Sequence, residues 1–298
     1  TSQAAMKLYN RQNELLADAA ERSSVVADWL NQACYPGNAF TEIWRRFILH
    51  QFHDDLTGTS IPRAYEFSWN DELISLQQLS GILTSSVDAV VRQMNTKTKG
   101  IPIVIYNSLG YDVTDLAEVE IETSKAPKDV SVYNADGKKV AAQLLSYTDG
   151  KAKLLLEATV PAVGYAVYDV RISKHSVISS DASVLENSIY KLSLDQNGDV
   201  VSLFDKKNNK EMVKEGKAIR LALFTDNKSY VWPAWEIKKT TIDTIPQSIT
   251  DDVKITVLED GILRKSICVE KRYGESNFKQ YIRMYEGSRA DRIDFYNE

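Results

Sequence analysis

Hydrophobic and polar residues follow a helical repeat over the first third of the chain. Residues 4–32 contain neither proline nor glycine and are rich in good helix formers, and a Pro-Gly pair follows at 36–37. Residues 71–94 repeat leucine and valine every three or four positions. Between these segments, an apolar stripe with the spacing of an amphipathic helix runs through Phe40, Ile43, Trp44, Phe47 and Ile48. We therefore predict a bundle of three helices.

Helix-end signals divide the bundle further. Asn38 is a candidate N-cap for the second helix, which we expect to continue to His53 and to end at Gly58. Ser60 is a candidate N-cap for a further helical segment, with Pro62 in its first turn, where the missing N–H costs nothing.

The period changes near residue 100 from helical to alternating, which is typical of strands. Asp-Gly pairs at 136–137 and 149–150 are strong hairpin signals. These patterns predict a small antiparallel β-sandwich of about 70 residues. Its expected strands are 101–106, 119–122, 130–133 and 165–172.

A polar, serine-rich stretch at 174–183 connects this unit to a second strand-rich region. Asn197-Gly198 predicts a turn in that region. Further strands are expected at 189–195, 200–204, 219–224, 253–258, 262–269, 279–285 and 292–296. The predicted fold class is α+β multidomain: a three-helix bundle (1–99), a small β-sandwich (100–173) and the start of a large β super-sandwich (174–298). Because residue 298 directly follows a strand-like run, we expect that sandwich to be cut short.

Composition fits a soluble globular protein, with 43% hydrophobic and 26% charged residues in 298. The net charge of −5 is spread along the chain and argues against nucleic acid or an anionic membrane as partner. With no long apolar run, we expect a cytoplasmic or periplasmic location in a bacterium rather than a membrane. Cys34 and Cys268 fall in different predicted domains, and we expect two buried free thiols.

The segment 51–59 gathers a histidine, two carboxylates, two hydroxyls and a turn glycine. If the second helix reaches His53, this side chain lies opposite Trp44 and points away from the bundle, with Asp54 nearer the edge of the stripe. An imidazole beside a carboxylate suits zinc binding or proton transfer. The same pattern also fits a solvated surface histidine, because a metal site needs three or four protein ligands and no second cluster has ligand spacing.

Gln51-Phe52-His53-Asp54, followed by Thr57-Gly58-Thr59, resembles the signature of the middle helical domain of family 38 glycoside hydrolases, the retaining α-mannosidases. The resemblance implies that His53 is a zinc ligand and that Asp54 holds the substrate sugar. Asp55 stands where a small or apolar residue is usual in that family.

The β-region adds weaker likenesses in the same order. Residues 104–109 are similar to an apolar strand that ends in Asn-Pro-Leu, with Ser108 in place of proline. Residues 186–206 are similar to the start of the family's C-terminal β-domain, and Ala234-Trp235-Glu236 to its Ala-Trp-Asp/Glu segment. The resemblance thus covers nearly the whole chain, as an interior piece of a longer enzyme.

The resemblance also implies what this sequence lacks: an N-terminal catalytic domain of the barrel type that supplies the other zinc ligands and the aspartate nucleophile. A retaining glycosidase needs two carboxylates about 5 Å apart on opposite sides of the bond. Asp54 and Asp55 point in different directions on a helix, and Asp251-Asp252 falls in a predicted loop. We therefore expect no catalytic residue in this piece, weak zinc binding, no activity alone, and a mannose-containing oligosaccharide as the ligand of the whole enzyme.

Two other functions remain open. The chain could be a non-catalytic carbohydrate-binding or structural β-sandwich module, with Trp69, Trp232 and Trp235 as stacking platforms. Tyr65 and Trp69 would line a sugar site or serve as core aromatics. The chain could also belong to another sugar-active enzyme, a lyase or phosphorylase, although such sites need clusters of Tyr, His or Glu and only three histidines are present.

Overall fold

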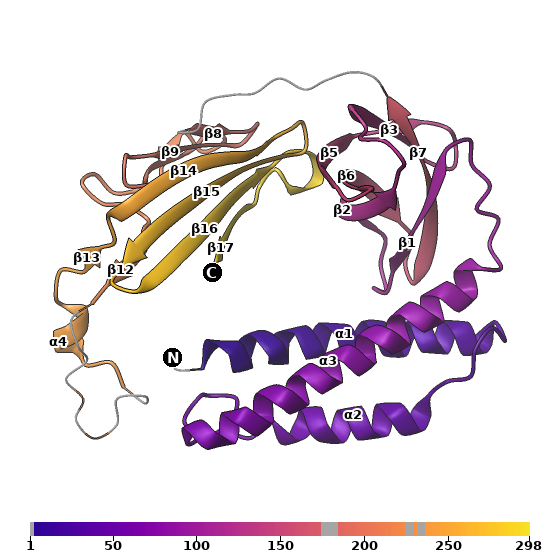
Figure 1. Cartoon of the computed structure of the whole chain (residues 1–298), viewed down its shortest axis with the longest axis horizontal. Coiled ribbons are helices and arrows are strands. Elements are labelled where there is room, and N and C mark those ends of the chain that lie inside the picture. Colours follow the sequence, from indigo (N-terminus) through magenta and orange to yellow (C-terminus); the bar gives the residue numbers. More distant parts are fainter. Residues whose placement is uncertain (1–2, 174–183, 225–228, 230, 232–235) are drawn as a thin grey trace.

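The computed structural model describes residues 3–173, 184–224, 229, 231 and 236–298. A layer of helices lies along one side, and two β-units arch over it (Figure 1). The small β-sandwich stands next to the helices, and the C-terminal sheets continue the arch over the helical layer toward the N-terminus. The predicted α+β multidomain class is therefore confirmed. Within the described ranges, none of the helices combines the length and hydrophobicity needed to cross a bilayer.

The helical layer consists of α1 (Ala4–Trp29), α2 (Gly37–Leu49) and α3 (Pro62–Val91). Its hydrophobic core joins all three helices through Ala17, Ala20, Phe40, Ile43 and Leu79. The two alanines on α1 allow its neighbours to approach closely, while the larger side chains fill the space between them.

Several predicted helix ends were wrong. α2 begins at Gly37 without a side-chain cap, so Asn38 lies inside its first turn, and it ends at Leu49, four residues before His53. α3 starts at Pro62, close to where the signals at Ser60 and Pro62 predicted a helical segment, and continues unbroken to Val91, but its N-cap is Ile61. Pro62 occupies the first turn as predicted. The Ser60 hydroxyl donates instead to the Asp54 carbonyl (3.0 Å).

Polar residues line part of the contact between α1 and α3. Asn13 and Glu72 are almost fully buried, and the Asn13 amide donates to both the carboxyl and the main-chain carbonyl of Glu72. Burial raises the pKa of Glu72 more than this hydrogen bond lowers it. Asn13 Oδ1 and Glu72 Oε1 have no hydrogen-bond partner among the described residues. A protonated Glu72 can donate as well as accept in this pair, which an ionised carboxylate cannot.

The small sandwich packs two sheets around one core. Strands β1, β7, β3 and β4 form one sheet in that order, and β2, β6 and β5 form the other. Asp149 and Gly150 both have positive φ, 52° and 81°, as a tight hairpin turn requires, so the turn predicted there is confirmed. The strands are β1 (Ile101–Asn107), β2 (Val113–Glu122), β3 (Asp129–Tyr133), β4 (Lys139–Val140), β5 (Ala142–Thr148), β6 (Lys151–Val160) and β7 (Gly164–Ser173).

The C-terminal region has two four-stranded sheets, β11-β10-β9-β8 and β14-β15-β16-β17, and a two-stranded β12-β13 pair. One core that includes Leu192, Val200, Ile267 and Ile282 joins the four-stranded sheets. The elements are β8 (Val184–Glu186), β9 (Tyr190–Leu194), β10 (Val200–Asp205), β11 (Lys210–Glu211), β12 (Ala222–Leu223), α4 (Lys239–Ile242), β13 (Gln247–Ser248), β14 (Asp251–Asp260), β15 (Arg264–Tyr273), β16 (Ser276–Tyr285), η1 (Gly287–Arg289) and β17 (Ile293–Asn297).

Three further predictions for this region and the cysteines need correction. The strand expected at 219–224 is reduced to the two residues of β12, and Asp251-Asp252 opens strand β14 instead of lying in a loop. Both cysteines are free as expected, but only Cys268 is buried, since Cys34 lies at the surface after α1.

Side-chain contacts link the two β-units. Gln143 on β5 accepts hydrogen bonds from the amides of Leu263 and Arg264 (3.0 and 2.9 Å) and donates to the Arg264 carbonyl (3.0 Å). Gly261 leaves room for it, because a Cβ there would lie 1.8 Å from Gln143 Cδ. Arg289 on η1 forms an ion pair with Asp115 on β2. The small sandwich and the C-terminal sheets are therefore joined by specific polar contacts.

The turn before β10 requires glycine for two reasons. Gly198 has φ of +70°, and a Cβ at this position would lie 2.3 Å from Val269 Cγ1 on the facing sheet. Gly137, in the β3–β4 hairpin, has φ of +77° with nothing within 4 Å of its ideal Cβ position. The two glycines thus share the left-handed backbone and differ in the steric constraint.

We predict that Gly198→Ala destabilises the chain by several times the cost of Gly137→Ala. The left-handed conformation costs a non-glycine residue about 1–2 kcal/mol at either position, and only Gly198→Ala adds a clash in the core. Chemical denaturation measures both changes, and Val269→Ala in the Gly198→Ala background should recover part of the difference. Equal costs for the two alanine variants would contradict the packing shown here.

We also predict that Glu72→Gln stabilises the chain at pH 7 by about 1–3 kcal/mol, because the neutral amide can both donate to and accept from Asn13. A raised carboxyl pKa means that the native state retains a proton that the unfolded state releases. The native glutamate therefore loses stability relative to the glutamine variant as pH rises above the ordinary value of 4.5 and through its raised native value. Unfolding free energies from pH 4 to 8 test this, with exposed Glu66→Gln on the same helix as a control that should show no such trend.

Candidate functional site

The candidate site is the His53 loop, residues 50–61, which connects α2 to α3. It is a series of tight turns held by its own main chain: the amide of Asp55 donates to the Phe52 carbonyl (3.0 Å), and that of Thr59 donates to the Asp54 carbonyl (3.1 Å). Gly58 has φ of +91°, which suits glycine and reverses the chain before α3.

His53 and Asp54 project from this loop to the surface. The His53 side chain is 76% exposed, and its Nε2 lies 3.4 Å from Asp54 Oδ2. The Phe52 ring packs against the imidazole, with 4.2 Å between ring centroids. The outward direction predicted for His53 is confirmed, although it comes from a loop and not from a continued helix.

Hydroxyl groups hold the main chain of this pair. The Thr57 hydroxyl donates to the His53 carbonyl, and the Thr59 hydroxyl donates to Asp54 Oδ1 (3.1 Å). The Asp54 carbonyl also accepts from the Tyr65 hydroxyl (3.1 Å). The Thr-Gly-Thr sequence thus has a local structural reason, since each threonine fixes one member of the pair.

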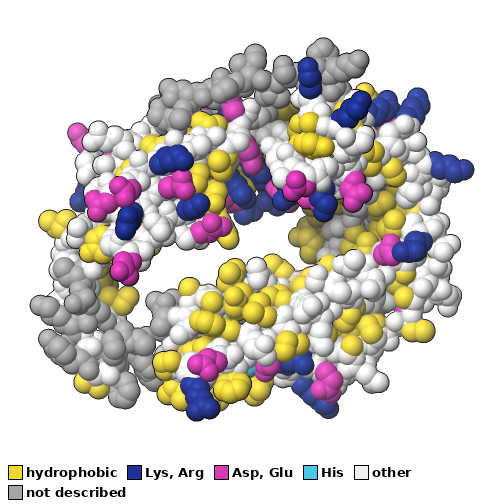
Figure 2. All heavy atoms as spheres, in the orientation of Figure 1, with side chains coloured by type: hydrophobic (Ala, Val, Ile, Leu, Met, Phe, Trp, Pro, Cys, Tyr) yellow, Lys and Arg dark blue, Asp and Glu magenta, His cyan; other side chains and the backbone are white. Residues whose placement is uncertain are grey.

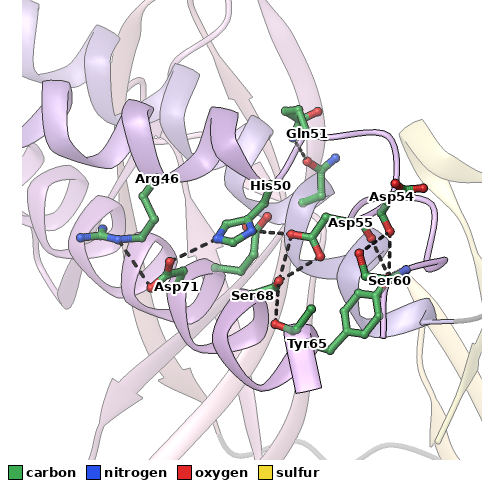
Figure 3. A network of polar contacts seen from close by, with 12 residues as sticks. Arg46, His50, Gln51, Asp54, Asp55, Ser60, Tyr65, Ser68 and Asp71 are labelled. Carbon is green, nitrogen blue, oxygen red and sulfur yellow. Dashed lines mark hydrogen bonds and ion pairs between the residues drawn. The ribbon is translucent and has the colours of Figure 1, made fainter. Parts of the chain in front are cut away.

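A buried network beneath the loop was missed in the sequence. His50 Nδ1 lies 2.5 Å from Asp55 Oδ2, and its Nε2 lies 3.3 Å from Asp71 Oδ2 (Figure 3). Both Asp55 oxygens lie 2.9 Å from the Ser68 hydroxyl. His50, Asp55 and Ser68 are all at least nine-tenths buried. The sequence of α3 does contain a sign of this network, because residues with polar groups recur every three or four positions along its buried face. They are Tyr65, Ser68, Glu72 and Ser75.

α1 holds the loop from the other side. The Lys7 ammonium donates to the carbonyls of Leu56 and Thr57 (3.2 and 3.0 Å), and the Gln51 amide donates to Asn10 Oδ1. Contacts from α1 and α3 therefore fix the main chain on both sides of His53.

Two of the aromatic candidates, Tyr65 and Trp69, lie among the described residues and pack together next to the loop. Tyr65 is buried and uses its hydroxyl to hold the loop. Trp69 is 38% exposed, and 6.4 Å separate its ring centroid from that of Tyr65. Trp232, Trp235 and the Ala234-Trp235-Glu236 motif lie wholly or partly outside the described residues. The predicted row of stacking platforms therefore stays a prediction.

The donor set for zinc is incomplete. In the described ranges, no group of three or more His, Cys, Asp or Glu side chains is placed to hold a metal ion. The exposed imidazole of His53 and the neighbouring Asp54 carboxylate are suitable donors, but zinc takes three or four protein ligands. These residues fit a site that is completed by groups from elsewhere. Their roles as ligand and substrate contact stay predictions.

Asp54 and Asp55 do not form a glycosidase pair. Asp54 faces solvent beside His53, whereas the Asp55 carboxylate is enclosed by His50 and Ser68. A carboxylate in that position cannot reach a glycosidic bond outside the bundle.

Comparisons with known proteins agree on one family. The model of the α-mannosidase middle domain matches residues 1–97, and that of the glycosyl hydrolases family 38 C-terminal domain matches residues 185–298. α-Mannosidase 2C1 of Mus musculus is 24% identical over 277 residues, and that of Homo sapiens is 25% identical; each alignment covers 89% of this chain and 24% of the relative. α-Mannosidase G of Dictyostelium discoideum is 24% identical over 291 residues.

Solved structures with a similar fold come from the same family. A family 38 glycosyl hydrolase from Enterococcus faecalis superposes with a TM-score of 0.71 at 16% identity, over 100% of this chain and 43% of that one. An α-mannosidase from Enterococcus faecalis V583 superposes with a TM-score of 0.70 at 15% identity, over 100% of this chain and 41% of that one. The chain spans about a quarter of the length of the curated α-mannosidases it matches. With an α-mannosidase middle-domain match and a family 38 C-terminal-domain match that together cover most of the described chain, this chain belongs to glycosyl hydrolase family 38.

Proposed function

We propose that this chain is the part of a zinc-dependent retaining α-mannosidase that contributes His53 to the metal and Asp54 to the substrate sugar. The observation that supports this most is the exposed His53–Asp54 pair, with its main chain fixed by both neighbouring helices. The substrate class is terminal α-mannosides of glycans. The chain by itself is inactive, because the nucleophile and the general acid belong to another part of the enzyme.

The two side chains have separate tasks. A neutral imidazole donates a nitrogen lone pair, and His53 presents its ring to solvent for this purpose. When bound, zinc would coordinate hydroxyls of the sugar and orient the ring. Asp54 Oδ1 is occupied by Thr59, so Oδ2, which faces His53, is the oxygen placed to accept from a sugar hydroxyl.

Exposed apolar side chains next to the pair support the proposal that another domain packs on this surface. Phe52, Ile61 and Phe67 are 55%, 71% and 64% exposed and lie in the loop or the first turns of α3. Hydrophobic side chains also gather on the side of the helical layer that faces the opening under the β-arch (Figure 2). Apolar residues clustered at a surface are typical of protein contacts. We propose the catalytic domain of the same enzyme as the partner of the helical layer.

We predict that His53→Ala in the enzyme that contains this chain lowers both zinc content and mannoside hydrolysis, the latter by more than about 100-fold, while the fold is kept. Metal analysis, initial rates and circular dichroism measure the three properties. Exposed Glu66→Gln serves as the control and should retain zinc and activity.

The 298-residue chain alone should show no mannosidase activity and only weak zinc binding, since one histidine and one carboxylate do not make a site. Full zinc content in the His53→Ala enzyme, or appreciable hydrolysis by the isolated chain, would show that the proposal is wrong.

A further inference from the structure

We propose that Asp55 is a positioning residue: its buried carboxylate, bonded to His50 and Ser68, fixes the loop that presents His53 and Asp54. For its effect on the metal site this inference rests on the proposed function, whereas its effect on the loop does not. The family resemblance predicted a small or apolar residue at this position, whereas this chain has an aspartate that is at least nine-tenths buried.

The carboxylate joins the start of the loop, its middle and α3 at one point. Asp55 belongs to the loop, His50 directly follows α2, and Ser68 lies in the second turn of α3. Oδ2 lies 2.5 Å from His50 Nδ1, and both oxygens lie 2.9 Å from the Ser68 hydroxyl (Figure 3). Hydrogen bonds to a charged group are stronger than neutral ones, and burial strengthens them further. The side chain therefore fixes the loop relative to both helices.

The main chain carries this constraint to the exposed pair. The Tyr65 hydroxyl lies 3.1 Å from the Asp54 carbonyl and 3.2 Å from the Asp55 carbonyl, and it accepts from the Ser60 amide (3.1 Å). Asp54 and His53 are only one and two residues from the buried carboxylate. Displacement of residue 55 would therefore move both candidate donors.

The buried partners depend on one another. Without the carboxylate, His50 Nδ1 loses its partner beneath the loop, and the Ser68 hydroxyl keeps only the Ala64 carbonyl (3.0 Å). A buried polar group without a partner is unfavourable, and the loop can relieve this only by moving to admit water. An apolar residue at position 55 would thus loosen the loop.

The first test compares two matched serines on α3. Ser68 and Ser86 are 4% and 5% exposed, and each hydroxyl makes a buried contact: Ser68 with Asp55, and Ser86 with Ser24 on α1 (3.0 Å). The two positions are 18 residues apart, about 27 Å along a helix. Ser68→Ala and Ser86→Ala should both lower stability, but only Ser68→Ala should speed amide hydrogen exchange in residues 52–59.

Asp55→Val should speed that exchange further, at least 10-fold over the rate in the unchanged protein, while amides in the middle of α1 stay protected. Asp55→Asn keeps an oxygen for Ser68. Its exchange rate in the loop should therefore lie between the rates of Asp55→Val and of the unchanged chain. Should Asp55→Val fail to fold, Ser68→Ala and Asp55→Asn carry the test. Unchanged exchange in the loop of the Asp55 and Ser68 variants overturns the inference.

Zinc binding separates this inference from the proposed function. In the enzyme that contains the chain, Asp55→Val should weaken zinc binding about 10–100-fold, as loss of an orienting partner does, with partial recovery in Asp55→Asn. A loosened loop with unchanged zinc affinity overturns the positioning role. Unchanged zinc content in His53→Ala refutes the proposed function instead, and loop exchange still decides whether Asp55 fixes the loop.

Discussion

A buried carboxylate must have hydrogen-bond partners, and in this chain Asp55 meets that requirement between two helices. The partners are His50 at the end of α2 and Ser68 on α3, and the connection between them is only a few turns long. The loop is therefore shaped by what it buries, and the exposed His53 and Asp54 take their positions from it. Glu72 and Asn13 extend the polar contact toward α1, although one oxygen of each side chain has no hydrogen-bond partner among the described residues.

Much of the architecture could be predicted from the sequence, because periodicity reports which face of an element is buried. The three helices, the hairpin at Asp149-Gly150 and the turn at Asn197-Gly198 follow from local patterns. Helix ends were predicted less well: α2 ends at Leu49 because the chain turns to bury His50 and Asp55, a tertiary contact that no local rule contains.

The site was predictable in part for a related reason. The exposed direction of His53 agreed with the prediction, and family resemblance supplied a role for it that the structure alone does not test. The residues beneath it escaped notice because a histidine, an aspartate and a serine that are 5 and 13 residues apart have no recognisable spacing. They become one unit only when α3 packs against the loop. The role of Asp55 is visible only in this packing, where its carboxylate meets His50 and Ser68.

The single amide of Gln143 has a consequence for sequence change in this family. Three main-chain groups of the β14–β15 turn converge on it, and Gly261 gives it the space to enter. Adding or removing one residue in that turn would misalign all three groups at once. Length variation among homologues should therefore accumulate at other hairpins, and a tag or reporter inserted at 261–263 should be tolerated far less well than one at the open 136–137 turn.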